Sequence, residues 1–401
     1  MLDLLKVKED IYYVGASDRK IRQFENYIPL TNGVSYNSYL IVDEKTCLLD
    51  TVDFSCVREF LDNIKKALNG RDLDYLVVHH MEPDHCASIE EVLLRYPNCI
   101  IVTNIQVKKM LGQFFDYNFD KMLLVKENDT LNLGKHELKF IFAPMVHWPE
   151  VMVSYELNNK ILFSADAFGS FGALSGNLFY DEVVDNTYFS ESRRYYSNIV
   201  GKYGQNVMNL FKKLEGVELK MICPLHGYLW RNNFDELLSH YTDWATYHAE
   251  EKAVVIIYAS MYGNTENACV RLSNVLNNLG VKNIKLYDIS ITDQTYLISE
   301  IFRCSHIVLA CPSYNGSLYP KMEYLINTLV NMKIKNRTFA LIENATWGQV
   351  ANKKMTELLD TLNNTIVLED KLSIKSSLKD SDNESLENLA IAIVGSFSCN
   401  L

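Results

Sequence analysis

The sequence predicts an α/β protein of two domains, a β-rich domain of packed sheets with helices outside, followed by a doubly wound parallel sheet. Its 401 residues exceed the length of one ordinary domain and suffice for two hydrophobic cores. Near residue 251 the apolar pattern changes from short strand-like runs to a regular alternation of strands and amphipathic helices. We therefore expect one domain over residues 1–250 and another over residues 251–401.

Strands of the first domain are predicted by short apolar runs between polar turns. Residues 39–42 and 47–49 are expected to form a hairpin, and helical periodicity over residues 57–68 predicts a helix outside the sheets. Further strands are predicted at residues 75–78, 100–102, 138–142 and 161–163. A helix over residues 235–252 is expected to lead across the domain boundary.

The second domain is predicted from its alternating pattern. Residues 253–258 form a buried-strand run, and helical periodicity over residues 265–279 ends at Gly280. Further strands are predicted at residues 284–287, 306–310, 338–342 and 365–368. Five strands with intervening helices indicate a doubly wound parallel sheet, which binds ligands at the carboxyl ends of its strands.

Composition and charge exclude several classes of protein. With 48% hydrophobic and 22% charged residues, the chain is typical of soluble globular proteins, and no apolar run is long enough to span a bilayer. The first residues lack the basic and apolar regions of an export signal, so we expect a cytoplasmic protein with no membrane partner. The net charge of -11 argues against a nucleic-acid partner, because such binding depends on Lys and Arg.

Cysteine usage points away from a thiolate metal site. The nine cysteines are scattered from Cys47 to Cys399, and no two have C-x-x-C spacing. An odd number of scattered cysteines predicts free thiols in a reducing compartment rather than a disulfide framework.

Potential metal ligands gather directly after the predicted strand at residues 75–78 and recur at the edges of three later apolar runs. They are His80, Glu82, Asp84, His85, His147, Asp166 and His226. The first four are expected to converge on a turn without a helix, and strand ends of one sheet region are expected to gather the last three. Four imidazoles and three carboxylates without a thiolate suit iron, manganese or catalytic zinc. The three carboxylates offset most of the charge of two divalent ions, so a two-metal site is electrostatically reasonable.

The other histidines are expected to be ordinary. His79 should point to the opposite side of its strand from His80, so it is not included among the ligands. His136, His240 and His306 stand alone, and single histidines are often partly buried without a special role.

Three loops of the second domain predict a flavin site at the carboxyl edge of its sheet. The first follows a strand and opens a helix, where hydroxyls and backbone N–H groups can surround a phosphate without Lys or Arg, as suits FMN rather than NAD, FAD or ATP. Tyr314 and Trp347 are flat enough to stack on the ring. The loops are Ser260, Met261, Tyr262, Gly263, Asn264 and Thr265; Pro312, Ser313, Tyr314, Asn315 and Gly316; and Asn344, Ala345, Thr346, Trp347 and Gly348.

The run from His80 to His85 resembles the metallo-β-lactamase superfamily, in the branch of the flavodiiron proteins. Zinc hydrolases of that superfamily have His-x-His-x-Asp-His, whereas Glu82 replaces the second histidine here, as in the diiron branch. The second domain resembles flavodoxin, although its third loop departs from the usual Gly-rich form. The resemblance implies an N-terminal metallo-β-lactamase-like αββα sandwich and a C-terminal flavodoxin-like domain.

The same resemblance implies the cofactors and the reaction. His80, Glu82 and His147 would hold the iron nearer the flavin, Asp84, His85 and His226 would hold the distal iron, and Asp166 would bridge them. An external donor would reduce FMN, FMN would reduce the two irons, and the centre would reduce O2 to water or NO to N2O. Tyr195 and Tyr196 are candidates for residues that set the preference between O2 and NO.

The resemblance also implies partners. The chain has no C-x-x-C pairs of a rubredoxin module, so the donor is expected to be a separate molecule, either rubredoxin or a reduced deazaflavin. A head-to-tail homodimer is expected, with tetramers built from such dimers. Two alternatives are a zinc-dependent hydrolase fused to a flavodoxin, which Glu82 opposes, and an electron carrier whose first domain has lost its metals, which the complete ligand set opposes.

Overall fold

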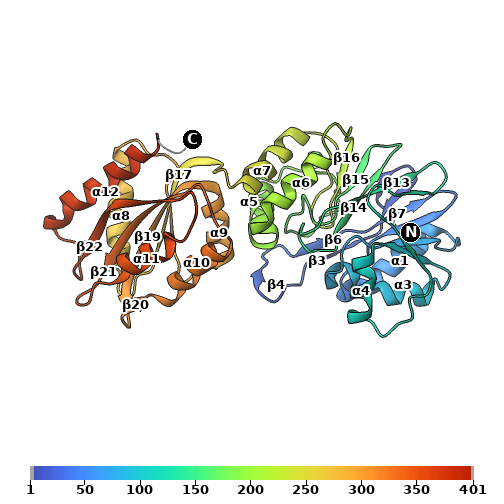
Figure 1. Ribbon diagram of the computed structural model, residues 1–401, viewed down its shortest axis with the longest axis horizontal. Coiled ribbons are helices and arrows are strands. Elements are labelled where there is room, and N and C mark those ends of the chain that lie inside the picture. The colour runs from blue at the N-terminus through green and yellow to red at the C-terminus, as the bar shows by residue number, and fades with distance from the viewer. Residues whose placement is uncertain (1–3, 399–401) are drawn as a thin grey trace. The chain divides into compact units, whose positions relative to one another are not determined.

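The computed structural model describes residues 4–398, and the chain divides after Tyr241 into two compact units (Figure 1). The division falls within helix α7 (Phe234–Thr246), shortly before the boundary expected at residues 250 and 251. The expected helix over residues 235–252 is wrong at its end, because Tyr247 has the positive φ of 57° that stops a helix. Glu251 already begins a strand of the second unit.

The first unit contains two main sheets. The seven-stranded sheet has the order β1-β2-β7-β8-β9-β10-β11, and the predicted hairpin is confirmed by antiparallel pairing of β7 with β8. Its strands are β1 (Lys6–Lys8), β2 (Ile11–Tyr13), β7 (Tyr39–Val42), β8 (Thr46–Leu49), β9 (Tyr75–Val77), β10 (Ile100–Thr103) and β11 (Met122–Leu124).

The five-stranded sheet has the order β12-β13-β14-β15-β16, in which β15 and β16 run parallel. Its strands are β12 (Thr130–Asn132), β13 (Glu137–Phe142), β14 (Met152–Glu156), β15 (Ile161–Phe163) and β16 (Met221–Cys223). Two small antiparallel pairs flank the sheets, β3 (Ala16–Asp18) with β6 (Val34–Tyr36), and β4 (Gln23–Phe24) with β5 (Ile28–Pro29).

The first unit is layered as helices, sheet, sheet and helices, which confirms the predicted sandwich. Apolar side chains of both sheets, such as Tyr39 and Phe163, meet in one core between them. A second core lies under α1 (Val57–Leu68), α3 (Ile89–Arg95) and α4 (Ile105–Phe114). On the other side, α5 (Tyr188–Tyr195), α6 (Gly204–Lys213) and α7 lie beside the five-stranded sheet (Figure 1).

Helix α1 illustrates how the sequence determines the buried face and the end of a helix. Phe60, Ile64 and Leu68 recur at helical spacing and are buried against the seven-stranded sheet. Asn69 follows in the left-handed conformation with φ of 46°, which ends the helix. The prediction over residues 57–68 is confirmed at both ends.

The second unit is a parallel sheet in the order β18-β17-β19-β21-β22, which is the flavodoxin-like order 2-1-3-4-5. Short β20 (Ser317–Leu318) pairs with the end of β19. The strands are β17 (Glu251–Tyr258), β18 (Lys285–Asp288), β19 (Cys304–Tyr314), β21 (Thr338–Asn344) and β22 (Ile366–Ile374). The helices are α8 (Asn264–Asn278), α9 (Gln294–Arg303), α10 (Pro320–Asn331), α11 (Ala351–Leu359) and α12 (Asn383–Ser396). Helices α8 and α12 pack over a core that the sheet strands complete.

Arg337, the residue before β21, is buried with only 1% of its surface exposed. Its guanidinium donates to the backbone oxygens of Ile301, Phe302 and Tyr247 at 2.7, 2.6 and 2.7 Å, and also to those of Lys335 and Asn336. A buried charge is tolerated when its donors are satisfied in this way. These hydrogen bonds hold the backbone at Tyr247 against the segment of Ile301 and Phe302 in the second unit.

Two further features of the described residues concern membrane spans and the state of the cysteines. Among residues 4–398, no helix is long and apolar enough to cross a bilayer. The cysteines within the same residues are free thiols, and most of them are buried. Cys399 lies outside the described residues.

Candidate metal centre and flavin pocket

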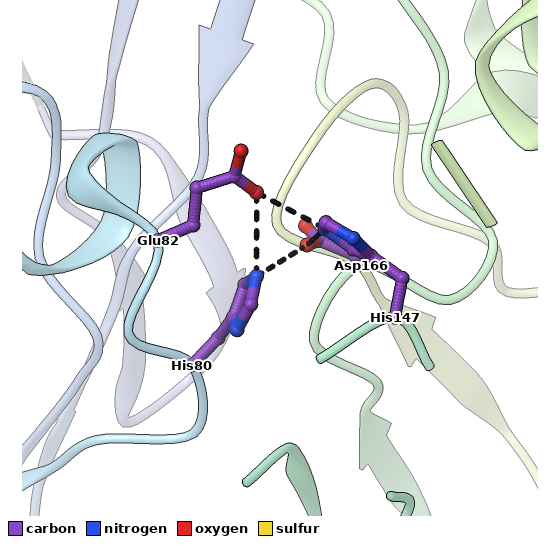
Figure 2. A group of neighbouring side chains, drawn as sticks. All are labelled: His80, Glu82, His147 and Asp166. Carbon is purple, nitrogen blue, oxygen red and sulfur yellow. Dashed lines mark hydrogen bonds and ion pairs between the residues drawn. The ribbon is translucent and has the colours of Figure 1, made fainter. Parts of the chain in front are cut away.

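The predicted ligands of the first unit meet in two adjoining buried groups. The first contains His80, Glu82, His147 and Asp166, which point toward one another in Figure 2, and the second contains Asp84, His85 and His226. In each group, one ligand atom per residue lies within 4.8 Å of the others. The structure thus brings together every ligand that the sequence predicts.

Asp166 faces both groups at once. Its Oδ2 lies 3.2 Å from Nε2 of His80 and 3.2 Å from Nε2 of His147. Its Oδ1 lies 3.3 Å from Nε2 of His85 and 3.6 Å from Nε2 of His226. One carboxylate with its two oxygens directed at two groups of ligands is the arrangement that a bridge between two metal ions requires.

A short helix positions two ligands that we expected on a turn. Glu82 is extended, with φ of -66° and ψ of 139°, and Pro83 then begins α2 (Pro83–Cys86), where its fixed φ suits the first helical position. Asp84 and His85 therefore lie on a helical turn, and Glu82 stands just before it. The expectation of convergence without a helix was wrong, because the proline converts this turn into a helix.

The five-stranded sheet gathers the last three candidate ligands, as we expected, whereas the first four follow a strand of the other sheet. His80 follows β9 of the seven-stranded sheet, whereas Asp166 and His226 follow the parallel strands β15 and β16 of the other. His147 lies in the connection between β13 and β14, beyond the end of its strand, because the apolar residues 143–146 form a turn. The centre therefore sits where the ends of two packed sheets meet.

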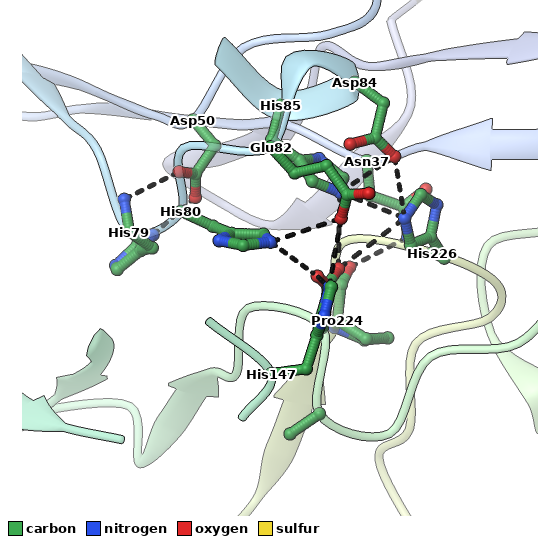
Figure 3. A network of polar contacts seen from close by, with 12 residues as sticks. Asn37, Asp50, His79, His80, Glu82, Asp84, His85, His147, Pro224 and His226 are labelled. Atoms are coloured by element: carbon green, nitrogen blue, oxygen red, sulfur yellow. Dashed lines mark hydrogen bonds and ion pairs between the residues drawn. The ribbon is translucent and has the colours of Figure 1, made fainter. Parts of the chain in front are cut away.

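The loop that carries His226 is held by Ser35 of β6 and by Asn37, which follows that strand; Figure 3 shows Asn37 near Pro224 and His226. Asn37 donates through Nδ2 to the backbone oxygens of Pro224 and Gly227, each at 2.9 Å. His226 donates from Nδ1 to the backbone oxygen of Ser35 at 2.7 Å. This bond fixes the tautomer and leaves Nε2 free to bind a metal.

Gly227 follows in a conformation that favours glycine. Its φ is +77°, and an added Cβ would lie 3.2 Å from the side chain of Ser170. A side chain at this position would strain the backbone and crowd the neighbouring loop, so His226 depends on glycine after it.

Glu150 orients the ring of His80 as the backbone oxygen of Ser35 orients that of His226, although we did not predict this role. Its Oε1 lies 2.8 Å from Nδ1 of His80 and accepts from the backbone N–H of Met81 at 2.9 Å. The contact directs Nε2 of His80 toward Glu82 and Asp166. Glu150 follows His147 by three residues, but nothing in the sequence distinguishes it from a surface glutamate.

His79 points away from the centre, as we expected. Its Nδ1 lies 2.5 Å from Oδ2 of Asp50 (Figure 3). Its Nε2 lies 2.6 Å from Oγ of Ser154. Both ring nitrogens are therefore engaged in a buried network that supports the strand before His80.

The chemistry of the centre fits a pair of cations. Both carboxylate oxygens of Asp84 and of Asp166 are buried without a hydrogen-bond partner among the described residues. Burial raises the pKa of Asp84 to about 8. Burial lowers the pKa of His147, but contacts with Asp166 and Glu82 outweigh this and raise it to about 9. Buried carboxylates without donors, facing imidazole nitrogens, are stabilised when cations lie between them.

The two tyrosines proposed to set substrate preference lie in different surroundings. The ring of Tyr195 lies 5.4 Å from that of His226, and its buried hydroxyl has no hydrogen-bond partner among the described residues. The ring of Tyr196 instead packs against Tyr241 at 5.1 Å. Of the two, Tyr195 is placed beside the metal ligands.

The three loops of the second unit line one pocket of about 490 Å³. From the predicted set, Gly263 and Tyr314 are not part of its lining, and Val350 and Ser376 join it. The lining residues are Ser260, Met261, Tyr262, Asn264, Thr265, Pro312, Ser313, Asn315, Gly316, Asn344, Ala345, Thr346, Trp347, Gly348, Val350 and Ser376. Trp347 is 84% exposed, so one face of its ring is open to a ligand. Tyr314 packs its ring toward Tyr319.

Backbone geometry and side-chain contacts shape this pocket. Gly263 has a φ of 86° and precedes α8, so the loop turns tightly and opens the helix N-terminus toward the pocket. The Oγ of Ser260 accepts from the backbone N–H of Glu266 at 3.2 Å. Asn344 donates to Oγ1 of Thr265 at 3.3 Å and to the backbone oxygen of Ser376 at 2.9 Å. Asn344 thus ties the first loop to a segment after β22, a contact between distant positions that no local pattern signals.

Two adjoining groups of histidines and carboxylates in one unit, and a pocket at the carboxyl edge of a flavodoxin-like sheet in the other, define a protein with a candidate metal centre and a candidate cofactor site. The family model described as ODP family beta lactamase matches residues 34–227. The anaerobic nitric oxide reductase flavorubredoxin of Citrobacter koseri is 30% identical over 88% of this chain and 74% of its own length. The chain belongs to the flavodiiron protein family and is an oxidoreductase.

Solved structures agree with this family. Rubredoxin oxygen:oxidoreductase from Desulfovibrio gigas is 27% identical and superposes with a TM-score of 0.93, covering 99% of both chains. The flavodiiron protein from Giardia intestinalis has the same fold, with a TM-score of 0.93 at 24% identity, over 100% of this chain and 99% of its own. An uncharacterized protein of Methanocaldococcus jannaschii is 31% identical over 95% of each chain.

Proposed function

We propose that the protein reduces O2 to water, NO to N2O, or both, with two non-haem irons and FMN as cofactors and electrons from an external donor. The observation that carries the proposal is Asp166, whose two oxygens face two separate groups of buried ligands. The names of the similar proteins support both substrates, since one is a nitric oxide reductase and another an oxygen oxidoreductase. The second name also supports rubredoxin as the donor, with a reduced deazaflavin as the other candidate.

The ligand types favour iron over zinc at this centre. His80, Glu82 and His147 would hold one iron, Asp84, His85 and His226 the other, and Asp166 would bridge them. When bound, the two irons supply electrons and open coordination positions for a small oxidant. The chain itself holds the imidazoles in one tautomer through Glu150 and Ser35 and excludes bulk water by burial.

FMN is proposed for the pocket at the carboxyl edge of the second sheet. The helix N-terminus after Gly263 and the hydroxyl groups of Ser260 and Thr265 suit a phosphate held by dipoles. Ser376 and Thr346, whose Oγ atoms lie 2.9 Å apart, close one side of the pocket. Trp347 offers an exposed ring on which the flavin can stack.

We further propose a head-to-tail homodimer in the cytoplasm, with larger oligomers built from such dimers. The metal ligands end at His226 and the flavin loops begin at Ser260, in separate units. Electron transfer needs the two centres close together, and a second copy can bring its flavin to the metals of the first.

Metal analysis of the purified protein, together with its absorption spectrum and turnover with each gas, tests the proposed function. We expect two irons and one FMN per chain, and consumption of O2 or NO when a reduced rubredoxin is supplied. Zinc without gas turnover would favour a hydrolase instead. Flavin alone, with no bound metal, would indicate an electron carrier.

A further inference from the structure

A second pocket, of about 430 Å³, lies in the first unit beside the metal centre. Its lining includes Leu30, Ser170, Phe171 and Gly227, and Gly227 directly follows the ligand His226. The pocket therefore reaches the loop that carries a metal ligand, from the side of the second ligand group.

The charges around this pocket balance. Arg19 and Arg194 are offset by Asp185 and Glu191. Arg194 is 1% exposed and already donates to Oε2 of Glu191 at 2.6 Å and to the backbone oxygen of Pro29 at 3.0 Å. With no excess of either sign, the pocket favours a neutral occupant over an anion or a cation.

An aromatic layer connects the pocket to His226. The ring of Phe171 lies 5.1 Å from that of Tyr195 and 5.6 Å from that of Phe24. The rings of Tyr195 and Phe24 lie 5.4 and 5.6 Å from that of His226. Phe171 is 4% exposed and the other two are also buried, so the layer is shielded from bulk water.

At the inner end of the layer, next to His226, lies the hydroxyl group of Tyr195. The Oη of Tyr195 is buried and has no hydrogen-bond partner among the described residues, which is uncommon for a buried polar group. The ring packs closely on the loop of Asp166, since a Cβ added to Gly169 would lie 3.1 Å from the ring and 3.0 Å from the Asp166 backbone oxygen. This hydroxyl is available to donate to a small molecule that arrives beside the ligands.

We propose that a neutral diatomic gas reaches the metal centre from this pocket, through the layer formed by Phe171, Phe24 and Tyr195. The inference rests on the proposed function, because it concerns the entry of O2 or NO. Apolar rings that change rotamer transiently admit a small apolar molecule, whereas ions and water lose their hydrogen bonds on entering such a layer. Phe171 is the outermost ring and controls the entrance.

The substitution Phe171→Trp tests the route by filling the entrance with a larger ring. In the iron- and FMN-loaded enzyme we expect kcat/KM for the gas to fall about tenfold, while kcat at saturating gas stays unchanged because the centre itself is intact. Phe114→Trp, the same change at a residue on α4 that is 45% exposed, is the matched control and should change neither parameter. An unchanged kcat/KM in Phe171→Trp, with normal iron content, overturns the route.

Xenon provides a second measurement that does not depend on turnover or on a variant. We expect crystals of the wild-type holoenzyme under xenon pressure to show a xenon atom within the aromatic layer or in the adjoining pocket. Xenon bound elsewhere only, or not at all, overturns the route even if Phe171→Trp fails to load iron. A wild-type enzyme that reduces neither gas contradicts the proposed function, and the xenon result still decides whether the layer admits an apolar gas.

Discussion

The two oxygens of Asp166 lie against different pairs of histidines, and the residue is completely buried. Removing its carboxylate leaves both ligand groups incomplete while the other six ligands remain. Its effect on the two cofactors should differ, because the flavin pocket belongs to the other unit.

We expect Asp166→Ala to lose at least one of the two irons and all reduction of O2 or NO while retaining FMN. Removal of a carboxylate that binds both metals weakens the binding of both. Loss of a metal ligand or of its supporting residue lowers metal affinity or activity by about 10-fold or more. Iron and flavin content per chain are the measurements. Full iron occupancy in the variant would contradict the bridging role.

At the level of residues, the sequence predicted the candidate metal ligands that the structure brings together, because four of them are close together in the chain and each of the others follows an apolar run. It missed Glu150 because a glutamate three residues after His147 is not distinguishable from a surface glutamate until the fold brings it to His80. It also missed Ser376, whose place in the flavin pocket depends on a hydrogen bond from Asn344. Residues that support a site through distant contacts leave no local pattern.

Among the elements, the loop between β17 and α8 should control flavin binding. We expect the double substitution Ser260→Ala and Thr265→Val to weaken FMN retention by about thirtyfold, since it removes two hydrogen bonds worth about 1 kcal/mol each. Titration of FMN into the apoprotein measures this change. The iron content should stay as in the wild type, and an unaltered flavin affinity would show that the phosphate binds elsewhere.

The packing of α12 against β19 makes the stability of the second unit depend on pH. His306 is 2% exposed, its Nε2 lies 3.0 Å from Oγ of Ser396 on α12, and burial lowers its pKa to about 4. The unfolded chain has a histidine pKa of about 6.5 and binds the proton more readily than the folded chain. The folded state therefore loses stability as the pH falls from about 6.5 to about 4, by about 3 kcal/mol.

Urea unfolding at several pH values, followed by the fluorescence of bound FMN, measures this effect. We compare the wild type with His306→Gln, which keeps a polar side chain but cannot gain the proton. The difference in unfolding free energy between the two should shrink or reverse as the pH falls over that range. Parallel pH profiles would show that His306 does not carry the effect.

Helices and strands were predictable where burial and periodicity agree, as in α1. Strand β14 (Met152–Glu156) was missed although all its residues are buried, because Ser154 and Glu156 are polar. Ser154 Oγ lies 2.6 Å from Nε2 of His79, and Glu156 Oε1 lies 3.2 Å from Nδ1 of His136. These polar residues are buried because of contacts with distant residues, so the strand lacks the continuous apolar run that would predict it. The end of α7 was missed because its stop at Tyr247 depends on tertiary contacts rather than on Gly or Pro.

For the whole molecule, the proposed head-to-tail dimer predicts that two defective chains complement each other. We mix Asp166→Ala, which lacks iron, with the Ser260→Ala and Thr265→Val chain, stripped of its FMN, after dissociation and reassociation. Each parent should be inactive without added flavin, and the mixed dimer should recover activity because one intact flavin faces one intact metal centre. Mixed dimers that contain both cofactors but stay inactive would place electron transfer within a single chain.

The buried Arg337 decides where the protein can be dissected. Its guanidinium donates to the backbone oxygen of Tyr247, so the segment of residues 242–250 before β17 belongs to the second unit. A gene fragment that starts at Glu251 lacks Tyr247 and therefore leaves the buried guanidinium without one of its acceptors. Such a loss costs about 1.5 to 3 kcal/mol, the worth of a hydrogen bond to a charged group. A fragment that starts at Thr242 should have a free energy of unfolding higher by at least that amount than one that starts at Glu251, because it also keeps the hydrogen bond from the Tyr247 hydroxyl to the backbone oxygen of Met332. Equal urea midpoints for the two fragments would show that residues 242–250 contribute nothing. A domain exchange with other flavodoxin-like proteins should accordingly place its junction within α7, after Tyr241, so that residues 242–250 stay with the second unit.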